Sequence, residues 1–186
     1  MAEPDKASDT SGCENSSLAI FISDPDLRKL FDYWCEKRQG RTMPAKDDID
    51  PIEISWALTR IFLMDYDPAD GFRYRLAGSE VAAMFGRSNL KGLTFADILP
   101  PEGAELVEQR WMPMVEEPSV ICMKGLVYLA AERTPIGERV LLPLADEAGE
   151  KVIGVLGMTV CEWITGSVPA EIMHSPVKSI PVTAIP

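Results

Sequence analysis

The sequence is poor in histidine and in paired cysteines, the residues from which many metal and redox sites are built. Its one histidine, His174, lies in a stretch interrupted by prolines. A single histidine excludes HExxH zinc sites and Ser-His-Asp hydrolysis, and it disfavours a histidine-ligated haem in the core. The four cysteines are far apart and form no CxxC pair, which supports neither a zinc ribbon nor a thioredoxin-type redox site. We therefore expect no metal site, no cofactor, and thiols that are buried or incidental.

Positive charge and long apolar runs are also scarce. The chain has 18 Lys and Arg residues against 29 Asp and Glu residues, a net charge of −11. This charge repels phosphate backbones and anionic lipids, so we expect no nucleic-acid partner and no membrane insertion. No stretch approaches the roughly 18–20 apolar residues of a membrane-spanning helix, and residues 1–10 lack the basic-then-apolar layout of a signal peptide. These absences predict a cytoplasmic protein.

The first third of the chain predicts a tail, a helix and a connector. Residues 1–22 are polar and acidic without periodicity, which predicts a disordered tail. Residues 23–59 predict a helix followed by a polar connector, because Ser23 or Asp24 can cap the helix and Pro25 suits its first turn. Asp50 and Pro51 repeat this start signal, which predicts a second, short helix at 51–58. The apolar face of this helix supplies the candidate interface residues: Leu27, Leu30, Phe31 and Trp34.

Residues 60–163 have the pattern of a domain core with strands at both ends and small helices between them. In the second strand Phe72, Tyr74 and Leu76 alternate with arginines, which places all three on the core-facing side. These elements fit a five-stranded antiparallel sheet with helices on one face, so the predicted fold class is α+β. The expected elements are strands at 61–66 and 72–76, short helices at 79–85 and 90–99, a helix at 101–112 stopped by Pro113, a turn at 134–137, and strands at 119–131, 138–144 and 151–162.

The last predicted strand is apolar on both faces, whereas a sheet with one solvated face alternates. The helix at 24–39 can cover the second face, either by folding back within the chain or by contacting another subunit. Trp34 suits a closing intramolecular contact or an interface anchor equally well. The second arrangement predicts a homodimer through this helix.

Small helices over a concave sheet often leave an internal cavity, and methionines adapt to varied ligands. An ordinary packed core is the alternative. No nucleophile with a base partner is found, so we expect no catalytic residue and no enzymatic activity. The candidate pocket residues are Tyr74, Leu76, Val81, Met84, Phe85, Phe95, Ile98 and Met123.

Residues 164–186 form a Pro-rich tail, and its prolines exclude a regular helix. Two expectations remain open for this segment: a plain disordered terminus, or an extended stretch that adds to a partner's groove or sheet edge.

Several short motifs resemble one family of stand-alone bacterial PAS-domain proteins with an N-terminal helix. They are RTMPA at 41–45, DIDP at 48–51, IFL at 61–63, RLAGS at 75–79, FGR at 85–87, LKG at 90–92 and LPL at 142–144. The resemblance spans about residues 25–162, and the element order, two strands, small helices and three strands, is also that of a PAS domain. It implies sensing or protein interaction, with no settled chemistry.

Two cofactor classes of PAS domain fit this sequence poorly. A flavin-photoadduct PAS domain needs a cysteine in the short helix after the hairpin, where this chain has FGRSNL at 85–90. A haem-sensing PAS domain offers an axial histidine in the pocket helices, whereas His174 follows the last predicted core strand. We therefore expect a non-enzymatic sensory or protein-interaction module that acts in trans on signalling proteins, since no stretch remains for an effector domain. The alternatives are a sensor that binds a small molecule or cofactor and a small α+β enzyme.

Overall fold

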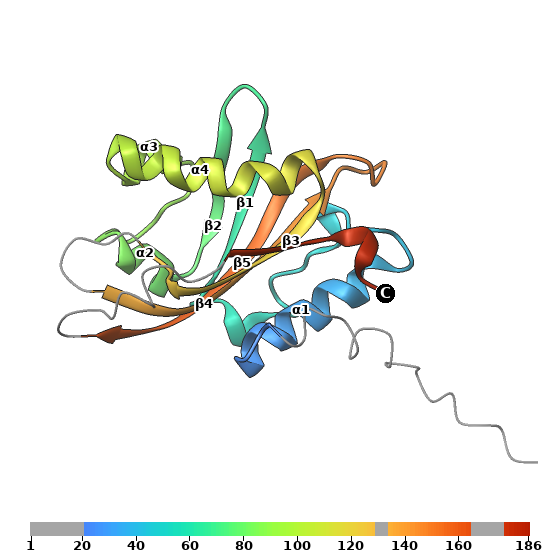
Figure 1. Ribbon diagram of the computed structural model, residues 1–186, viewed down its shortest axis with the longest axis horizontal. Helices are drawn as coiled ribbons and strands as arrows, with labels where there is room; N and C mark the ends of the chain where they lie inside the picture. The colour runs from blue at the N-terminus through green and yellow to red at the C-terminus, as the bar shows by residue number, and fades with distance from the viewer. Residues whose placement is uncertain (1–20, 129–133, 165–176) are drawn as a thin grey trace, which may run out of the picture.

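The computed structural model describes residues 21–128, 134–164 and 177–186. They form a six-stranded antiparallel sheet in the order β2-β1-β5-β4-β3-β6, with helices against both of its faces (Figure 1). The strands are β1 (Ile61–Asp67), β2 (Gly71–Ala77), β3 (Ser119–Leu126), β4 (Thr134–Ala145), β5 (Val152–Ile164) and β6 (Val177–Pro181). The helices are α1 (Pro25–Arg38), α2 (Ser79–Met84), α3 (Phe95–Ile98) and α4 (Pro101–Glu116). The predicted α+β class is confirmed.

Helix α1 covers one face of the sheet, so the chain itself supplies the cover that the doubly apolar strand requires (Figure 1). Its start follows the predicted chemistry, because Asp24 accepts hydrogen bonds from the backbone N–H groups of Asp26 and Leu27 at 2.9 and 3.1 Å. The indole Nε1 of Trp34 donates to the carbonyl of Pro143 in β4 at 2.9 Å. This buried hydrogen bond joins the helix to the sheet.

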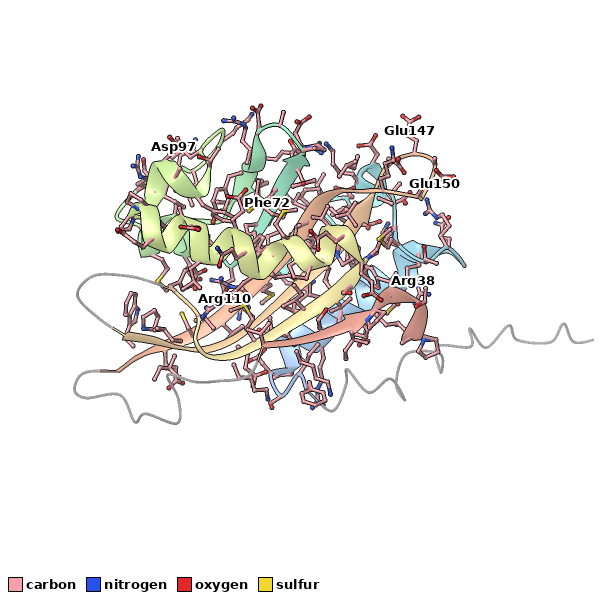
Figure 2. All side chains as sticks on the ribbon, turned by 45° about the horizontal axis from the view of Figure 1, so that its top comes forward. Arg38, Phe72, Asp97, Arg110, Glu147 and Glu150 are labelled. Atoms are coloured by element: carbon pink, nitrogen blue, oxygen red, sulfur yellow. The ribbon has the colours of Figure 1, made fainter. Side chains whose placement is uncertain are left out.

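The opposite face of the sheet carries α2, α3 and α4, and a second core lies beneath them. Aromatic rings dominate this core: Trp111 of α4 lies with its ring centroid 5.1 Å from Phe95, 5.4 Å from Phe72 and 5.9 Å from Phe62. Figure 2 shows Phe72 between α4 and the sheet. The sheet therefore separates two apolar cores, one under α1 and one under α4.

The sheet has six strands instead of five because residues 177–181, assigned to the Pro-rich tail, form β6. This strand pairs with β3, with Ile180 opposite Val120, and a single 3-10 turn at Val182–Ala184 follows it. Proline is tolerated here because β6 is an edge strand and Pro181 stands at its end. The segment is extended, as expected, but it adds to the chain's own sheet.

A β-bulge changes the predicted face of one pocket candidate. Leu63 of β1 pairs with Leu76, and the next residue of β1 pairs with Tyr74, so Arg75 is an extra residue in β2. The alternation resets at this point. The prediction that Leu76 shares a face with Tyr74 is therefore wrong: Leu76 packs against the core on the α1 face of the sheet, and Tyr74 lies in the core under α4.

Three element boundaries also differ from the prediction. Helix α4 continues past Pro113 to Glu116, because Trp111 and Met114 on either side of the proline are buried against the sheet. Residues 134–137 belong to β4 and not to a turn. The helix expected near 51–58 is a series of turns with one 3-10 turn at Ser55–Ala57. Within the described residues no helix is long and apolar enough to cross a membrane.

Candidate ligand-binding site

A cavity of about 110 Å³ lies between the sheet and the helices α3 and α4. Every strand of the sheet except β5 contributes to its wall, and the rest comes from α3, α4 and the residues that directly follow α2, α3 and β3. The lining is mainly aromatic and aliphatic. Its residues are Phe62, Tyr74, Phe85, Phe95, Leu99, Val107, Arg110, Trp111, Met123, Lys124, Leu126, Val127, Tyr128, Arg139 and Val177.

A buried positive charge lies in this apolar wall. Arg139 stands in β4, an interior strand, and is only 8% exposed. Its Nε donates to the hydroxyl of Thr159 at 2.8 Å, and its guanidinium lies 4.4 Å from the ring centroid of Tyr128. Among the described residues it has no carboxylate partner and no other hydrogen-bond acceptor. The two terminal nitrogens of the guanidinium therefore keep their donor capacity.

Two tyrosine hydroxyls add further donor capacity to the same wall. Tyr74 and Tyr128 are both buried, and neither phenol hydroxyl has a hydrogen-bond partner within the ranges that the structure covers. Burial raises the pKa of Tyr74 well above its usual range, although the nearby Arg139 charge acts in the opposite direction. The phenol of Tyr74 is thus a neutral donor at physiological pH. Buried polar groups without partners are rare in folded proteins, and here they surround one cavity.

The charge of the cavity wall is opposite in sign to the net charge of the whole chain. The net charge is −11, yet no described lining residue is acidic. Besides Arg139, the charged lining residues are Arg110 and Lys124, and the ammonium of Lys124 lies on the opposite face of the sheet, where it pairs with Glu138 at 3.1 Å. Arg110 is exposed on α4 and marks the solvent side of the wall (Figure 2). The site is therefore apolar with a net positive charge.

The structure brings some of the candidate pocket residues together and separates others. Tyr74, Phe85, Phe95 and Met123 line the cavity. Val81 and Met84 border a different groove beside Trp163, Ile98 packs on the outside of the core under α4, and Leu76 lies on the opposite face of the sheet.

Arg139 is the main residue that the sequence reasoning missed. A signal was present in the sequence. Arg139 and Leu141 are two residues apart and therefore point to the same face of a strand that is apolar on both faces. A charge on the core-facing side of such a strand is an anomaly that needs a partner.

The four candidate interface residues lie inside the chain's own core. Leu27, Leu30, Phe31 and Trp34 are at most 2% exposed. Phe31 stacks on Trp34 with 6.1 Å between ring centroids. In this arrangement none of the four presents surface to a second subunit.

The described cysteines and acidic residues offer no built metal or thiolate site. Burial, together with the Glu138 carboxylate, raises the pKa of the Cys122 thiol to about 12, so this thiol is unreactive. No group of three metal-ligating side chains occurs in the parts of the chain that the structure describes, and His174 lies outside them.

Comparison with protein families gives one match. The model of a family described as PAS domain covers residues 22–160, about three quarters of the chain. Comparison with curated proteins and with solved structures gave no match.

Proposed function

The chain belongs to the PAS-domain family, whose members are sensory and signalling modules, and we propose that it senses a small molecule bound in the cavity under α3 and α4. The observation that carries this proposal is the buried guanidinium of Arg139, which faces the cavity and has no carboxylate partner among the described residues. A core that only had to pack would place an aliphatic side chain at this position.

The volume limits the size of the ligand. An apolar cavity of about 150 Å³ in another protein holds benzene, and the cavity here measures about 110 Å³. A compound with one ring or a short branched chain therefore matches the space. A haem or flavin is much larger and would require the walls to move apart.

β6 connects the cavity to the other face of the sheet. Val177 lines the cavity and begins β6. At the far end of this segment the guanidinium of Arg38 in α1 donates to the carbonyls of Ile185 and Pro186 at 3.0–3.3 Å (Figure 2). A ligand that favours one position of β6 shifts the equilibrium between two positions of α1, and such a shift is sufficient for signalling.

We propose further that the output is contact with a separate signalling protein, in trans and without catalysis by this chain. Its support is two exposed apolar side chains of the kind found in interfaces: Ile52 in the connector before β1, 79% exposed, and Trp163 at the end of β5. Crosslinking in the native cell tests this part. We expect Trp163→Ser to remove at least one crosslinked protein. Identical crosslinking patterns for the variant and the wild-type protein would contradict a role of Trp163 in partner contact.

Thermal denaturation with small ring compounds tests the sensing site. The probes are phenol, benzyl alcohol, benzamide, benzoate and benzylamine, and we expect at least one to raise the Tm of the wild-type protein. Val107→Phe places a ring in the cavity and should remove the increase, because Val107 lines the wall.

Leu106→Phe is the matched control, since Leu106 is the neighbouring residue of α4 but is exposed. It should respond to the compounds as the wild-type protein does. If no compound stabilises the wild-type protein, or if Val107→Phe responds equally, the cavity is not a binding site.

A further inference from the structure

The charge of Arg139 carries information about the ligand beyond its size. Glu138, which precedes Arg139 in β4, points to the opposite face, where it accepts hydrogen bonds from the backbone N–H groups of Ser23 and Asp24. It therefore cannot neutralise Arg139. The compensation that the described residues provide is one neutral hydroxyl and the faces of two aromatic rings, those of Tyr128 and Phe62.

A buried cation with such incomplete compensation is a ready site for an anion. The guanidinium has five N–H donors in a planar fork that matches the two oxygens of a carboxylate. Nε is occupied by Thr159, and no described residue accepts from the terminal nitrogens of Arg139, which can therefore serve a ligand. The hydroxyls of Tyr74 and Tyr128 in the same wall can donate to the remaining lone pairs of a carboxylate.

The number of charges favours a monoanion. A phosphate group has a charge of about −1.5 to −2 at neutral pH, whereas the deeply buried wall supplies one guanidinium. The other two cations of the wall are less available to a buried ligand, because Lys124 is paired with Glu138 and Arg110 is exposed. One carboxylate balances the buried charge, and a second would remain without a partner.

The rest of the cavity wall indicates which apolar group the ligand carries beside its carboxylate. Phe62, Phe95 and Trp111 surround the space with aromatic faces and edges. Such surfaces favour a flat apolar group through offset and edge-to-face contacts. We propose that the cavity binds a small aromatic monocarboxylate whose carboxylate lies on Arg139 and whose ring lies among these three side chains. This inference rests on the proposed sensing function.

Isothermal titration with three probes of similar size tests the charge preference. Benzoate is the anion, benzamide the neutral analogue and benzylamine the cation. We expect benzoate to bind the wild-type protein about tenfold or more tightly than benzamide, and benzylamine to bind most weakly. Arg139→Met keeps an unbranched side chain at this position but removes the charge and the N–H donors, so it should abolish the preference for benzoate.

Arg75→Met is the matched control, because Arg75 also lies on a strand but is exposed and does not line the cavity. It removes the same charge from the molecule and should leave the preference unchanged. Arg139→Lys provides a second variant should Arg139→Met fail to fold. It retains the charge without the planar fork, and we expect intermediate binding of benzoate.

The outcomes separate this inference from the proposed function. If benzamide binds the wild-type protein as tightly as benzoate, the cavity is a ligand site but the carboxylate assignment is wrong. The same conclusion follows if Arg139→Met or Arg139→Lys binds benzoate like the wild-type protein. If none of the three probes binds, the assignment is also wrong, and the wider Tm panel with Val107→Phe decides separately whether the cavity binds any small molecule.

Discussion

Gly157 of β5 illustrates how one residue determines the shape of the cavity wall. It is the cross-strand partner of Phe62, and a Cβ atom at this position would lie 2.1 Å from a ring carbon of Phe62. The ring cannot easily withdraw, because it is buried and packs against Trp111 and Tyr74. We predict that Gly157→Ala lowers the free energy of unfolding by about 1–3 kcal/mol, measured by urea denaturation.

A second glycine gives the opposite expectation and serves as the control. Gly103 lies in α4, where alanine has the higher helix propensity. Gly103→Ala should therefore stabilise the protein by roughly 0.5–1 kcal/mol. Equal stability of the two variants would show that Phe62 does not restrict the space above Gly157.

Trp34 provides a second prediction for a single residue. It is fully buried between α1 and the sheet, and its indole N–H is satisfied by Pro143. We predict that Trp34→Ala lowers the free energy of unfolding by about 3–5 kcal/mol, while sedimentation velocity shows the same oligomeric state as the wild-type protein.

Trp163→Ala is the comparison for this variant, because Trp163 is 43% exposed and its loss should cost far less. A Trp34→Ala protein of normal stability that sediments differently would instead support a role of α1 in dimer formation.

At the scale of an element, one carboxylate of β4, that of Glu138, holds the start of α1. Partial burial by itself raises the pKa of Glu138, but hydrogen bonds from Ser23, Lys124 and Asp24 outweigh this effect and the pKa is lowered. A lowered pKa in the folded state adds stability above the unfolded value of about 4.5, and this stability is lost as the pH falls through the folded pKa. The start of α1 should therefore loosen in acid.

We predict that Glu138→Gln makes unfolding less sensitive to acid, because glutamine cannot take up the proton. Urea denaturation at several pH values between about 6 and 3 measures this sensitivity. Glu147→Gln in the exposed turn after β4 is the control and should retain the wild-type pH dependence. A Glu138→Gln protein with the full acid dependence would assign that dependence to other carboxylates.

Local chemistry explains which elements could be predicted from the sequence. The cap at Asp24 and the apolar spacing of Leu27 to Trp34 predicted α1, and the turn at Asp67–Gly71 predicted the first hairpin. The bulge at Arg75 and the pairing of β6 with β3 depend on contacts between distant segments, which no local pattern contains. Four of the eight candidate pocket residues line the cavity, and among the other four the bulge accounts for Leu76, because alternation placed Tyr74 correctly but failed beyond the bulge.

At the scale of the whole molecule, β6 forms one edge of the sheet and has side chains on both faces, so its loss should affect both faces. Ile180 is buried beneath α1, while Val177 lines the cavity on the other face. We predict that Ile180→Asp releases β6, lowers the Tm and weakens benzoate binding together. Differential scanning calorimetry and isothermal titration measure the two effects. Ser179→Asp is the control, because Ser179 is exposed in the same strand. A loss of stability without any change in binding would separate β6 from the cavity.

The colour of the purified protein is a further property of the whole molecule. A cavity of about 110 Å³ matches a colourless compound with one ring. We therefore predict no absorption band in the visible spectrum of the freshly purified protein. A stoichiometric haem or flavin band would mean that the wall opens much further than the structure shows.

The late position of β6 in the chain has a consequence for synthesis on the ribosome. Its partner β3 ends about 50 residues earlier, at Leu126. At a translation rate of roughly 5–20 residues per second, the edge of β3 waits about 3–10 s for its neighbour. During this time its unpaired backbone is open to pairing with strands of other nascent chains on the same messenger RNA. Fast production should therefore increase aggregation during translation, even though the finished protein has this edge covered.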